Sequence, residues 1–260
     1  MLDDTAAISF EKVTKRFGDG PPALDSVSLS VPARQFLAIV GASGSGKTTL
    51  LQLINRLSEP SAGLLRVDAA DVQSLDPILL RRRIGYVFQE VGLFPHLTVA
   101  ENIAITPRLL GWEAERVKQR VDELLELVRL NPKYGTRYAH ALSGGEKQRV
   151  GVARALAARP DIVLMDEPFA AVDPIVRDGL GQDYRRLHDE LGVTTVMITH
   201  DILEALGLAD RIIVLRAGRV IADGPPSALL NHENAHVREL MQMPRKIAER
   251  VGALLAAKEP

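Results

Sequence analysis

The sequence contains no cysteine, and this absence removes three classes of function. Disulfide cross-links, catalysis by a thiolate and metal sites built on cysteine are all excluded, and a chain without cysteine fits the reducing cytosol. The chain also lacks an excess of charge of either sign, because 32 lysines and arginines meet 33 aspartates and glutamates. Since proteins that hold nucleic acid usually carry a basic surplus, we expect no nucleic-acid partner.

Long apolar runs are missing as well. No uninterrupted apolar segment approaches the roughly 20 residues that a helix needs to cross a bilayer. The first ten residues, MLDDTAAISF, are acidic where a secretory signal would be basic. We therefore expect a cytosolic protein, and if it works at a membrane, another chain must do the spanning.

The apolar residues that are present predict one α/β domain. Every second position is apolar in ISFEKV and SVSLSV, as in half-buried antiparallel strands. The short apolar runs QFLAIV, DIVLMD and TTVMIT are typical of buried parallel strands, and RIIVLRAGRVIADG is typical of a hairpin. Together these segments predict a three-layer α/β core with a mostly helical insertion at about residues 91–158.

Helical spacing recurs in several segments between these strands. One helix follows QFLAIV, a second runs from about Glu113 to Leu130, and a third begins at the N-cap and N1 pair Asp173 and Pro174, with Gly192 beyond its end. From Pro226 onward we expect two or three short helices. The apolar residues that the spacing predicts to face inward, or to form a stripe in the tail, are Leu50, Leu53, Ile54, Leu57; Val117, Val121, Leu124, Leu125, Val128; Val176, Leu180, Tyr184, Leu187, Leu191; and Ile247, Val251, Leu254, Leu255.

Residues 41–48, GASGSGKT, match the phosphate-loop pattern G-x-x-x-x-G-K-[ST] in full, between a predicted strand and a predicted helix. Glycines let backbone N–H groups turn toward a phosphate, and the helix N-terminus adds partial positive charge. We expect Lys47 to reach the β- and γ-phosphates of a nucleotide and the Thr48 hydroxyl to ligate Mg²⁺. A dinucleotide pattern fails, because Thr49 stands where its third glycine would fall. The residues predicted to bind the phosphates are Gly41, Ala42, Ser43, Gly44, Ser45, Gly46, Lys47, Thr48 and Thr49.

Two consecutive carboxylates, Asp166 and Glu167, end the apolar strand IVLM, at the edge of a parallel sheet where ligands bind. We expect Asp166 to hold Mg²⁺ through its hydration shell and Glu167 to orient and polarise an attacking water. His200 closes the next strand and could reach a γ-phosphate, although a histidine alone is more often structural. Gln89 also stands at a strand end, and by itself it indicates little.

The segment LSGGEKQR, residues 142–149, is a second loop of serine and glycine that opens a predicted helix. With the phosphate loop, IVLMDEP, AVDP and ITH, in this order and spacing, it resembles the nucleotide-binding subunit of an ATP-binding cassette (ABC) transporter. The resemblance covers nearly the whole chain. It implies a RecA-like P-loop core at about residues 1–90 and 159–225 with an antiparallel β subdomain, a helical subdomain at about 91–158, and a single domain over 1–240. The tail 241–260 would then be a short helical segment without a regulatory domain.

The same resemblance implies how the motifs cooperate. Two subunits associate head to tail with Mg²⁺ and ATP between them, and each places Ser143, Gly144 and Gly145 on the γ-phosphate held by the other. The implied roles of the remaining residues are adenine stacking for Phe17, Mg²⁺ contact and relay for Gln89, a catalytic switch for His200, and a contact between subunits for Asp173. Glu146 stands where many members have glutamine, and AAVDP replaces a commoner run, yet both changes leave these roles in place.

A finer resemblance, carried by LINRLSEPSAG and GLFPH, is to importers of osmoprotectants such as glycine betaine, choline and carnitine. These residues do not contact the solute, so they mark lineage only. Membrane permease subunits are the implied partners, a solute-binding protein an indirect one, and the cytoplasmic face of the inner membrane the implied place. The permease would dock on residues 90–107, where Val91, Leu93, Phe94 and Leu97 are apolar, although packing inside the subdomain explains such residues too.

Three functional hypotheses follow. The first is an ATP-driven importer motor for an osmoprotectant or for another small solute such as an amino acid. The second is a soluble ABC ATPase that acts on nucleic acid or ribosomes, which usually has two cassettes or a long coiled coil, and neither is present here. The third is a module that holds ATP without hydrolysing it, against which Glu167 and His200 argue.

Overall fold

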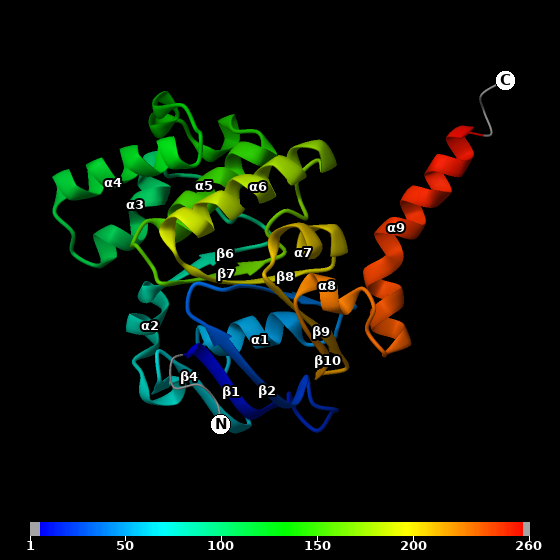
Figure 1. The fold of residues 1–260 in the computed structure, drawn as a ribbon. Helices are drawn as coiled ribbons and strands as arrows, with labels where there is room; N and C mark the ends of the chain where they lie inside the picture. The colour runs from blue at the N-terminus through cyan, green and yellow to red at the C-terminus, as the bar shows by residue number, and fades with distance from the viewer. Residues whose placement is uncertain (1–5, 257–260) are drawn as a thin grey trace.

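Two β-sheets form the framework of the protein (Figure 1). The computed structural model describes the backbone of residues 6–256 and the side chains of this range except those of residues 175 and 252–256. The first sheet is antiparallel, with strand order β2-β1-β4-β5. Its strands are β1 (Ala6–Lys15), β2 (Leu24–Pro32), β4 (Ala62–Val67) and β5 (Ala70–Asp71). The alternating segments ISFEKV and SVSLSV therefore pair as the sequence predicts.

The second sheet has the order β10-β9-β3-β8-β7-β6. Five of these strands are parallel, and β10 closes the hairpin with β9 in the antiparallel sense. The strands are β3 (Phe36–Val40), β6 (Ile84–Val87), β7 (Ile162–Asp166), β8 (Thr194–Thr199), β9 (Arg211–Arg216) and β10 (Arg219–Gly224). This mixed sheet confirms the predicted α/β class.

Helices cover both faces of the second sheet (Figure 1). Helix α1 (Lys47–Ile54) lies between the two sheets, and the opposite face carries α3 (Val99–Leu109), α4 (Ala114–Leu127), α5 (Gly144–Leu156), α6 (Pro174–Leu191) and α7 (Ile202–Leu208). The remaining helical segments are η1 (Val72–Ser74), α2 (Pro77–Arg83), η2 (Pro132–Thr136), η3 (Ala139–Ala141), α8 (Pro226–Leu229) and α9 (Ala235–Ala256).

Strand β3 shows why the layers form. Its five residues are all buried, because alternate side chains pack into different layers. Phe36, Ala38 and Val40 belong to the cluster shared with the outer helices. Leu37 and Ile39 belong to the cluster shared with α1 and the antiparallel sheet. A continuous apolar run thus becomes a central strand, and the loop that follows it lies at one edge of the sheet.

Most residues predicted to face inward do so, and three do not. Leu57 is 52% exposed, because α1 ends at Ile54. Val176 and Leu191 are 44% and 39% exposed, because they lie in the first and last turns of α6, outside the reach of its neighbours. In each case the apolar spacing continues beyond the helical turns that pack on the core.

The tail also differs from the expectation of several short helices. After the short α8, helix α9 runs without a break through Pro244, across the expected boundary at residue 240. Ile247 and Val251 are exposed, and the side chains of Leu254 and Leu255 lie outside the described residues. Among the described residues, no helix combines the length and the apolar character needed to cross a bilayer.

Candidate nucleotide-hydrolysis site

The carboxyl ends of four adjacent parallel strands bring the predicted site residues to one edge of the sheet. Strand order β3-β8-β7-β6 places the phosphate loop next to His200, His200 next to Asp166 and Glu167, and these next to Gln89. The register fixes this alignment, since Val40 pairs with Thr199, Asp166 with Ile198 and Val87 with Met165. Ligands bind at this edge of open parallel sheets.

The phosphate loop, residues 41–49, requires glycine at two positions for different reasons. A Cβ on Gly41 would lie 2.2 Å from the Leu215 carbonyl oxygen. Gly46 has φ +104°, and a Cβ there would lie 2.4 Å from the Ala23 carbonyl oxygen. Gly46 is also the N-cap of α1, and it supplies no side-chain cap. The first N–H groups of α1 are therefore left for a ligand, which is how helix N-termini bind anions.

Lys47 folds back over this loop. Its Nζ donates to the carbonyl oxygens of Gly41, at 2.8 Å, and Ala42, at 3.0 Å, and the side chain is 6% exposed. Burial lowers the pKa of Lys47, and the negative charges of Glu167 and Asp166 oppose this shift. A cation held near neutral carbonyls can exchange them for phosphate oxygens, which are stronger acceptors.

The rest of the loop is open to a ligand. Ala42, Ser43, Gly44 and Thr48 are exposed, and Thr49 is half-buried. Ser45 has a buried Oγ that no described residue reaches with a hydrogen bond. A buried polar atom without a partner is costly, so this hydroxyl is poised for an oxygen ligand.

Asp166 ends β7 beside a tyrosine that the sequence gave no reason to select. The Tyr86 hydroxyl donates to Asp166 Oδ2 at 3.4 Å. Burial raises the pKa of Asp166, the charge of Glu167 adds to that rise, and Tyr86 and Lys47 oppose it. Burial also raises the pKa of Tyr86, so its hydroxyl stays a donor. A cation beside Asp166 would stabilise its ionised carboxylate and oppose the rise of its pKa.

Magnesium fits this donor set. Among the described residues, no group of three or more histidine, cysteine or acidic side chains could hold a metal. Mg²⁺ is usually held by one or two protein oxygens, water and substrate phosphates rather than by a full protein cage. The exposed Thr48 hydroxyl and the Asp166 carboxylate, beside the phosphate loop, supply that smaller set.

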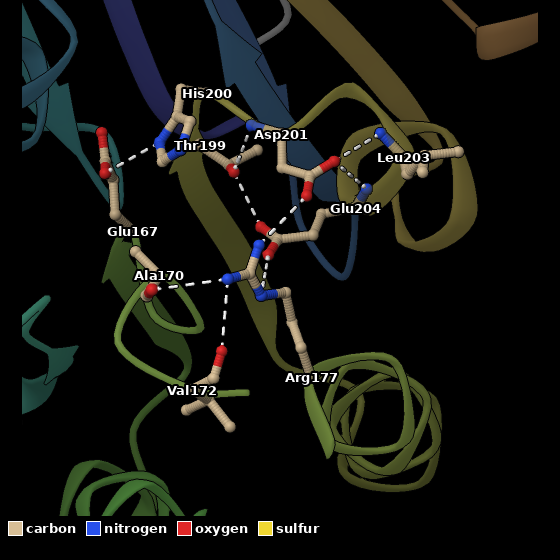
Figure 2. Close-up of polar contacts among 9 residues, drawn as sticks. All are labelled: Glu167, Ala170, Val172, Arg177, Thr199, His200, Asp201, Leu203 and Glu204. Atoms are coloured by element: carbon tan, nitrogen blue, oxygen red, sulfur yellow. Dashed lines mark hydrogen bonds and ion pairs between the residues drawn. The ribbon is translucent and has the colours of Figure 1, made fainter. Parts of the chain in front are cut away.

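Glu167, His200 and Gln89 converge, although 33 and 78 residues separate Glu167 from the other two along the chain. His200 Nδ1 lies 3.0 Å from Glu167 Oε2, as Figure 2 shows, and Gln89 Nε2 donates to the same oxygen at 3.4 Å. Since a carboxylate only accepts, the His200 contact fits a proton on Nδ1 and leaves Nε2 facing elsewhere. The Glu167 backbone has φ +44° and donates its N–H to Ile198 at 3.0 Å, which ties β7 to β8 at this point.

The signature segment, residues 142–149, lies elsewhere. Helices α1 and α5 flank opposite faces of the second sheet (Figure 1). Ser143 is the N-cap of α5, and it forms a capping box with Glu146: Ser143 Oγ accepts from the Glu146 N–H at 3.3 Å, and Glu146 Oε2 accepts from the Ser143 N–H at 2.7 Å. Ser143 and Gly144 are exposed, and the nearest atom to a Cβ on Gly144 would be the Ala171 carbonyl oxygen, at 3.9 Å. The phosphate loop of the same chain is not among these neighbours.

Phe17 and Asp173 complete the predicted set. Phe17 is 57% exposed on the loop after β1, and Lys15 Nζ lies 4.8 Å from its ring centre. An exposed ring near a cation is available for stacking. Asp173 is exposed and is the last residue of the D-loop, which we define as residues 170–173 and which immediately precedes α6.

Known proteins resemble this chain in sequence and in fold. A family model described as "ABC transporter" matches residues 24–170. A glycine betaine/carnitine/choline transport ATP-binding protein, OpuCA of Bacillus subtilis (strain 168), is 46% identical over 94% of this chain. A sulfate/thiosulfate import ATP-binding protein, CysA of Mycobacterium bovis, is also 46% identical, over 86% of this chain. This chain spans 64% of the first relative and 62% of the second, so it is shorter than both.

A solved structure of a known protein is similar to this chain over most of the length of both. It is described as a dimeric, post-hydrolysis state of the ATP-binding cassette MJ0796 bound to ADP and Pi. The similarity has a TM-score of 0.75 at 35% identity, and it covers 84% of this chain and 98% of the other.

Proposed function

The chain belongs to the ABC transporter family, and from this premise we propose that it is the ATP-hydrolysing subunit of an importer. The convergence of Glu167, His200 and Gln89, beside the loop that carries Lys47, is the observation that carries the proposal. A carboxylate held by a histidine and a glutamine can orient water toward a phosphate bound at the loop. Such a positioned base typically contributes about 10²- to 10⁴-fold in rate.

In this mechanism each residue of the chain has a separate task. The uncapped N–H groups of α1 and Lys47 Nζ bind the phosphates, and Phe17 stacks on the adenine. Glu167 accepts a proton from the attacking water, while His200 and Gln89 hold its carboxylate. Thr48, Asp166 and Gln89 would hold Mg²⁺, which neutralises phosphate charge when it is bound.

We further propose that two copies associate head to tail, so that Ser143, Gly144 and Gly145 of one copy contact the γ-phosphate at the other. The position of α5 supports this, because its N-terminus lies beside the D-loop of its own chain rather than beside its phosphate loop. The dimeric state described for the similar cassette MJ0796 supports association of two copies. Asp173 then lies between the subunits, as expected of a residue that precedes α6 on the surface.

The membrane permease would dock on a groove of about 270 Å³. Its lining includes Phe88, Phe94 and Ile105, and the two phenylalanines are 45% and 46% exposed. Leu93 packs instead against the core, so the apolar residues of 90–107 divide between packing and surface. Phe88, which lines this groove, directly precedes Gln89, and Gln89 would relay the state of the nucleotide to the permease. Docking on the permease would hold the subunit at the cytoplasmic face of the inner membrane.

The substitution Glu167→Gln tests hydrolysis. It keeps the shape of the side chain and removes the base, so we expect the rate of ATP hydrolysis to fall about 10²-fold or more, with nucleotide affinity unchanged. ATP should also convert this variant into a dimer, seen as a larger mass on sizing. Hydrolysis at the rate of the parent chain would contradict the proposal.

Mixed dimers test the site in trans. Lys47→Ala and Ser143→Arg should each be inactive alone. In a dimer that contains one copy of each variant, one site carries both defects and the other site carries neither. Recovered hydrolysis is the expected result, and a mixture that forms dimers but remains inactive would contradict independent composite sites.

For the solute we propose an osmoprotectant quaternary amine, in line with the name of OpuCA as a glycine betaine/carnitine/choline transport protein. A sulfate importer is the specific alternative, since CysA is equally identical. The complex with its permease and solute-binding protein distinguishes them: glycine betaine or choline should stimulate its ATP hydrolysis, and stimulation by sulfate alone would favour the alternative.

A further inference from the structure

One arginine outside the predicted site connects the two loops that carry the hydrolytic residues. Arg177 lies in the first turns of α6, directly after the D-loop. Its Nη2 donates to the carbonyl oxygens of Val172, at 3.2 Å, and Ala170, at 3.4 Å (Figure 2). The side chain therefore holds the turn that leads away from Glu167.

The other two nitrogens of the same guanidinium face the start of α7. Arg177 Nη1 donates to Asp201 Oδ2 at 3.3 Å, and its Nε lies 3.9 Å from Glu204 Oε1. Asp201 follows His200 in the chain and is the N-cap of α7, accepting from the N–H groups of Leu203 and Glu204. One cation thus contacts two carboxylates at the point where the His200 loop becomes a helix.

Thr199 extends the connection to the other side of His200. Its Oγ1 donates to Glu204 Oε2 at 2.7 Å and accepts from the Asp201 N–H at 3.0 Å. Glu204 has only 10% of its side chain exposed, so its charge lies in a setting of weak screening. The residues before and after His200 are therefore held by the acidic pair that Arg177 binds.

These contacts close a ring. It runs from Glu167 along the chain to Ala170 and Val172, through Arg177 to Asp201, and back through His200 to Glu167. Arg177 is the link in this ring that joins the D-loop to the His200 loop by side-chain contacts. Its Nε is buried without a hydrogen bond, so the guanidinium is held by charge and by its remaining donors.

We propose that Arg177 is a positioning residue for hydrolysis: it holds the D-loop and the His200 loop in one fixed arrangement, so that the position of the D-loop sets the contact between His200 and Glu167. The inference rests on the proposed ATP hydrolysis. In a head-to-tail dimer the D-loop would face the partner copy, so closure of the dimer would reach His200 through this arginine.

Arg185 offers a matched control on the same helix. Its side chain is 25% exposed against 23% for Arg177, and it also binds two carboxylates, those of Asp189 and Asp210. It donates to the Leu208 carbonyl oxygen at the far end of α7. Arg185 therefore connects the same two helices, away from both catalytic loops.

The test compares Arg177→Ala, Arg177→Lys and Arg185→Ala in the full chain, with ATP hydrolysis measured over a range of ATP concentrations. We expect kcat of Arg177→Ala to fall about tenfold or more while KM changes by less than about twofold, because small displacements of catalytic groups cost rate rather than binding. Lysine should recover part of kcat, since it can pair with the carboxylates but lacks the fork that reaches both carbonyls. Arg185→Ala should keep kcat within about twofold.

Hydrogen–deuterium exchange supplies a second readout that does not depend on turnover. In Arg177→Ala, exchange should accelerate together in the D-loop and in residues 199–204, and in Arg185→Ala it should not. Equal kcat values for the two alanine variants, or unchanged exchange in either loop, would overturn the inference.

Failure of the proposed function would give different experimental results. If the parent chain does not hydrolyse ATP, or Glu167→Gln hydrolyses it equally well, the proposed function fails. If Glu167→Gln is inactive but Arg177→Ala matches the parent chain, the inference about Arg177 fails and the function stands.

Discussion

The molecule contains two loops of glycine and serine that each precede a helix, and the two helix N-termini differ in whether a side chain caps them. In the phosphate loop, Gly46 is the N-cap of α1 and leaves the N-terminus of this helix without a side-chain cap. In the signature segment, Ser143 and Glu146 together cap the N-terminus of α5. One helix end is open, and the other is already satisfied by its own chain.

This difference shows that composition alone does not define a phosphate site. The open end of α1 has a lysine folded over it and carboxylates nearby, so the charged groups around it come from the same chain. The capped end of α5 brings a carboxylate of its own, which would repel a phosphate unless other charges accompany it. The signature segment therefore suits a nucleotide that is already bound and neutralised elsewhere.

Glycine substitutions should give the largest difference between the two loops, measured as the change in the free energy of unfolding. Gly46→Ala places a Cβ at φ +104° and 2.4 Å from the Ala23 carbonyl oxygen, so we expect a loss of about 3 kcal/mol in the free energy of unfolding. Gly144→Ala lies in α5 with its nearest neighbour 3.9 Å away, and alanine favours helix, so its change should stay within about 1 kcal/mol. Urea unfolding measures both, and equal losses would break the comparison.

We expect a smaller difference between the two loops in their effect on nucleotide binding by the single chain. Lys47→Ala removes a charged donor from the phosphates, so affinity for ATP should fall about 10- to 100-fold. Ser143→Ala should leave this affinity unchanged, although loss of the cap lowers the free energy of unfolding by about 1 kcal/mol. Titration of the full chain with a fluorescent nucleotide, below the concentration at which it dimerises, gives both values. Weaker binding by Ser143→Ala would place the signature segment at its own nucleotide.

The smallest expected effect concerns the pH dependence of the cap. The Ser143 N–H bonded to Glu146 holds the pKa of that carboxyl below its ordinary value of 4.5. A carboxyl with a lowered folded pKa stabilises the fold above its unfolded pKa, and this stabilisation is lost as the pH falls through the folded value. Between about pH 5 and pH 3, unfolding temperatures should therefore fall slightly more for the parent chain than for Glu146→Gln, which keeps the capping geometry. Parallel curves would mean that the carboxylate does not act as the cap.

The sequence predicted this site well where its residues follow strands. Asp166, Glu167, His200 and Gln89 each stand at a strand end, and a parallel sheet collects such ends at one edge. The structure brings Glu167, His200 and Gln89 into contact at this edge. Their catalytic roles stay predictions, as do those of Phe17 and Asp173.

What the sequence reading missed depends on contacts between distant segments. Tyr86 and Arg177 give no local signal, because Asp166 lies 80 residues from Tyr86 and Asp201 lies 24 residues from Arg177. The capping box has a local signal, a serine followed three residues later by glutamate, but the resemblance implies only a phosphate contact for Ser143. Leu57, Val176 and Leu191 were misplaced because periodicity continues past the turns that pack.

The backbone of Glu167 carries a consequence for how this protein tolerates change. At φ +44° the residue adopts a left-handed conformation that costs an ordinary side chain about 1 kcal/mol, and that glycine would adopt freely. The position is therefore one where selection for stability and selection for turnover oppose each other. Variants that relax the strand end would be recovered readily in a screen for heat resistance, and they would be the ones that no longer hydrolyse ATP.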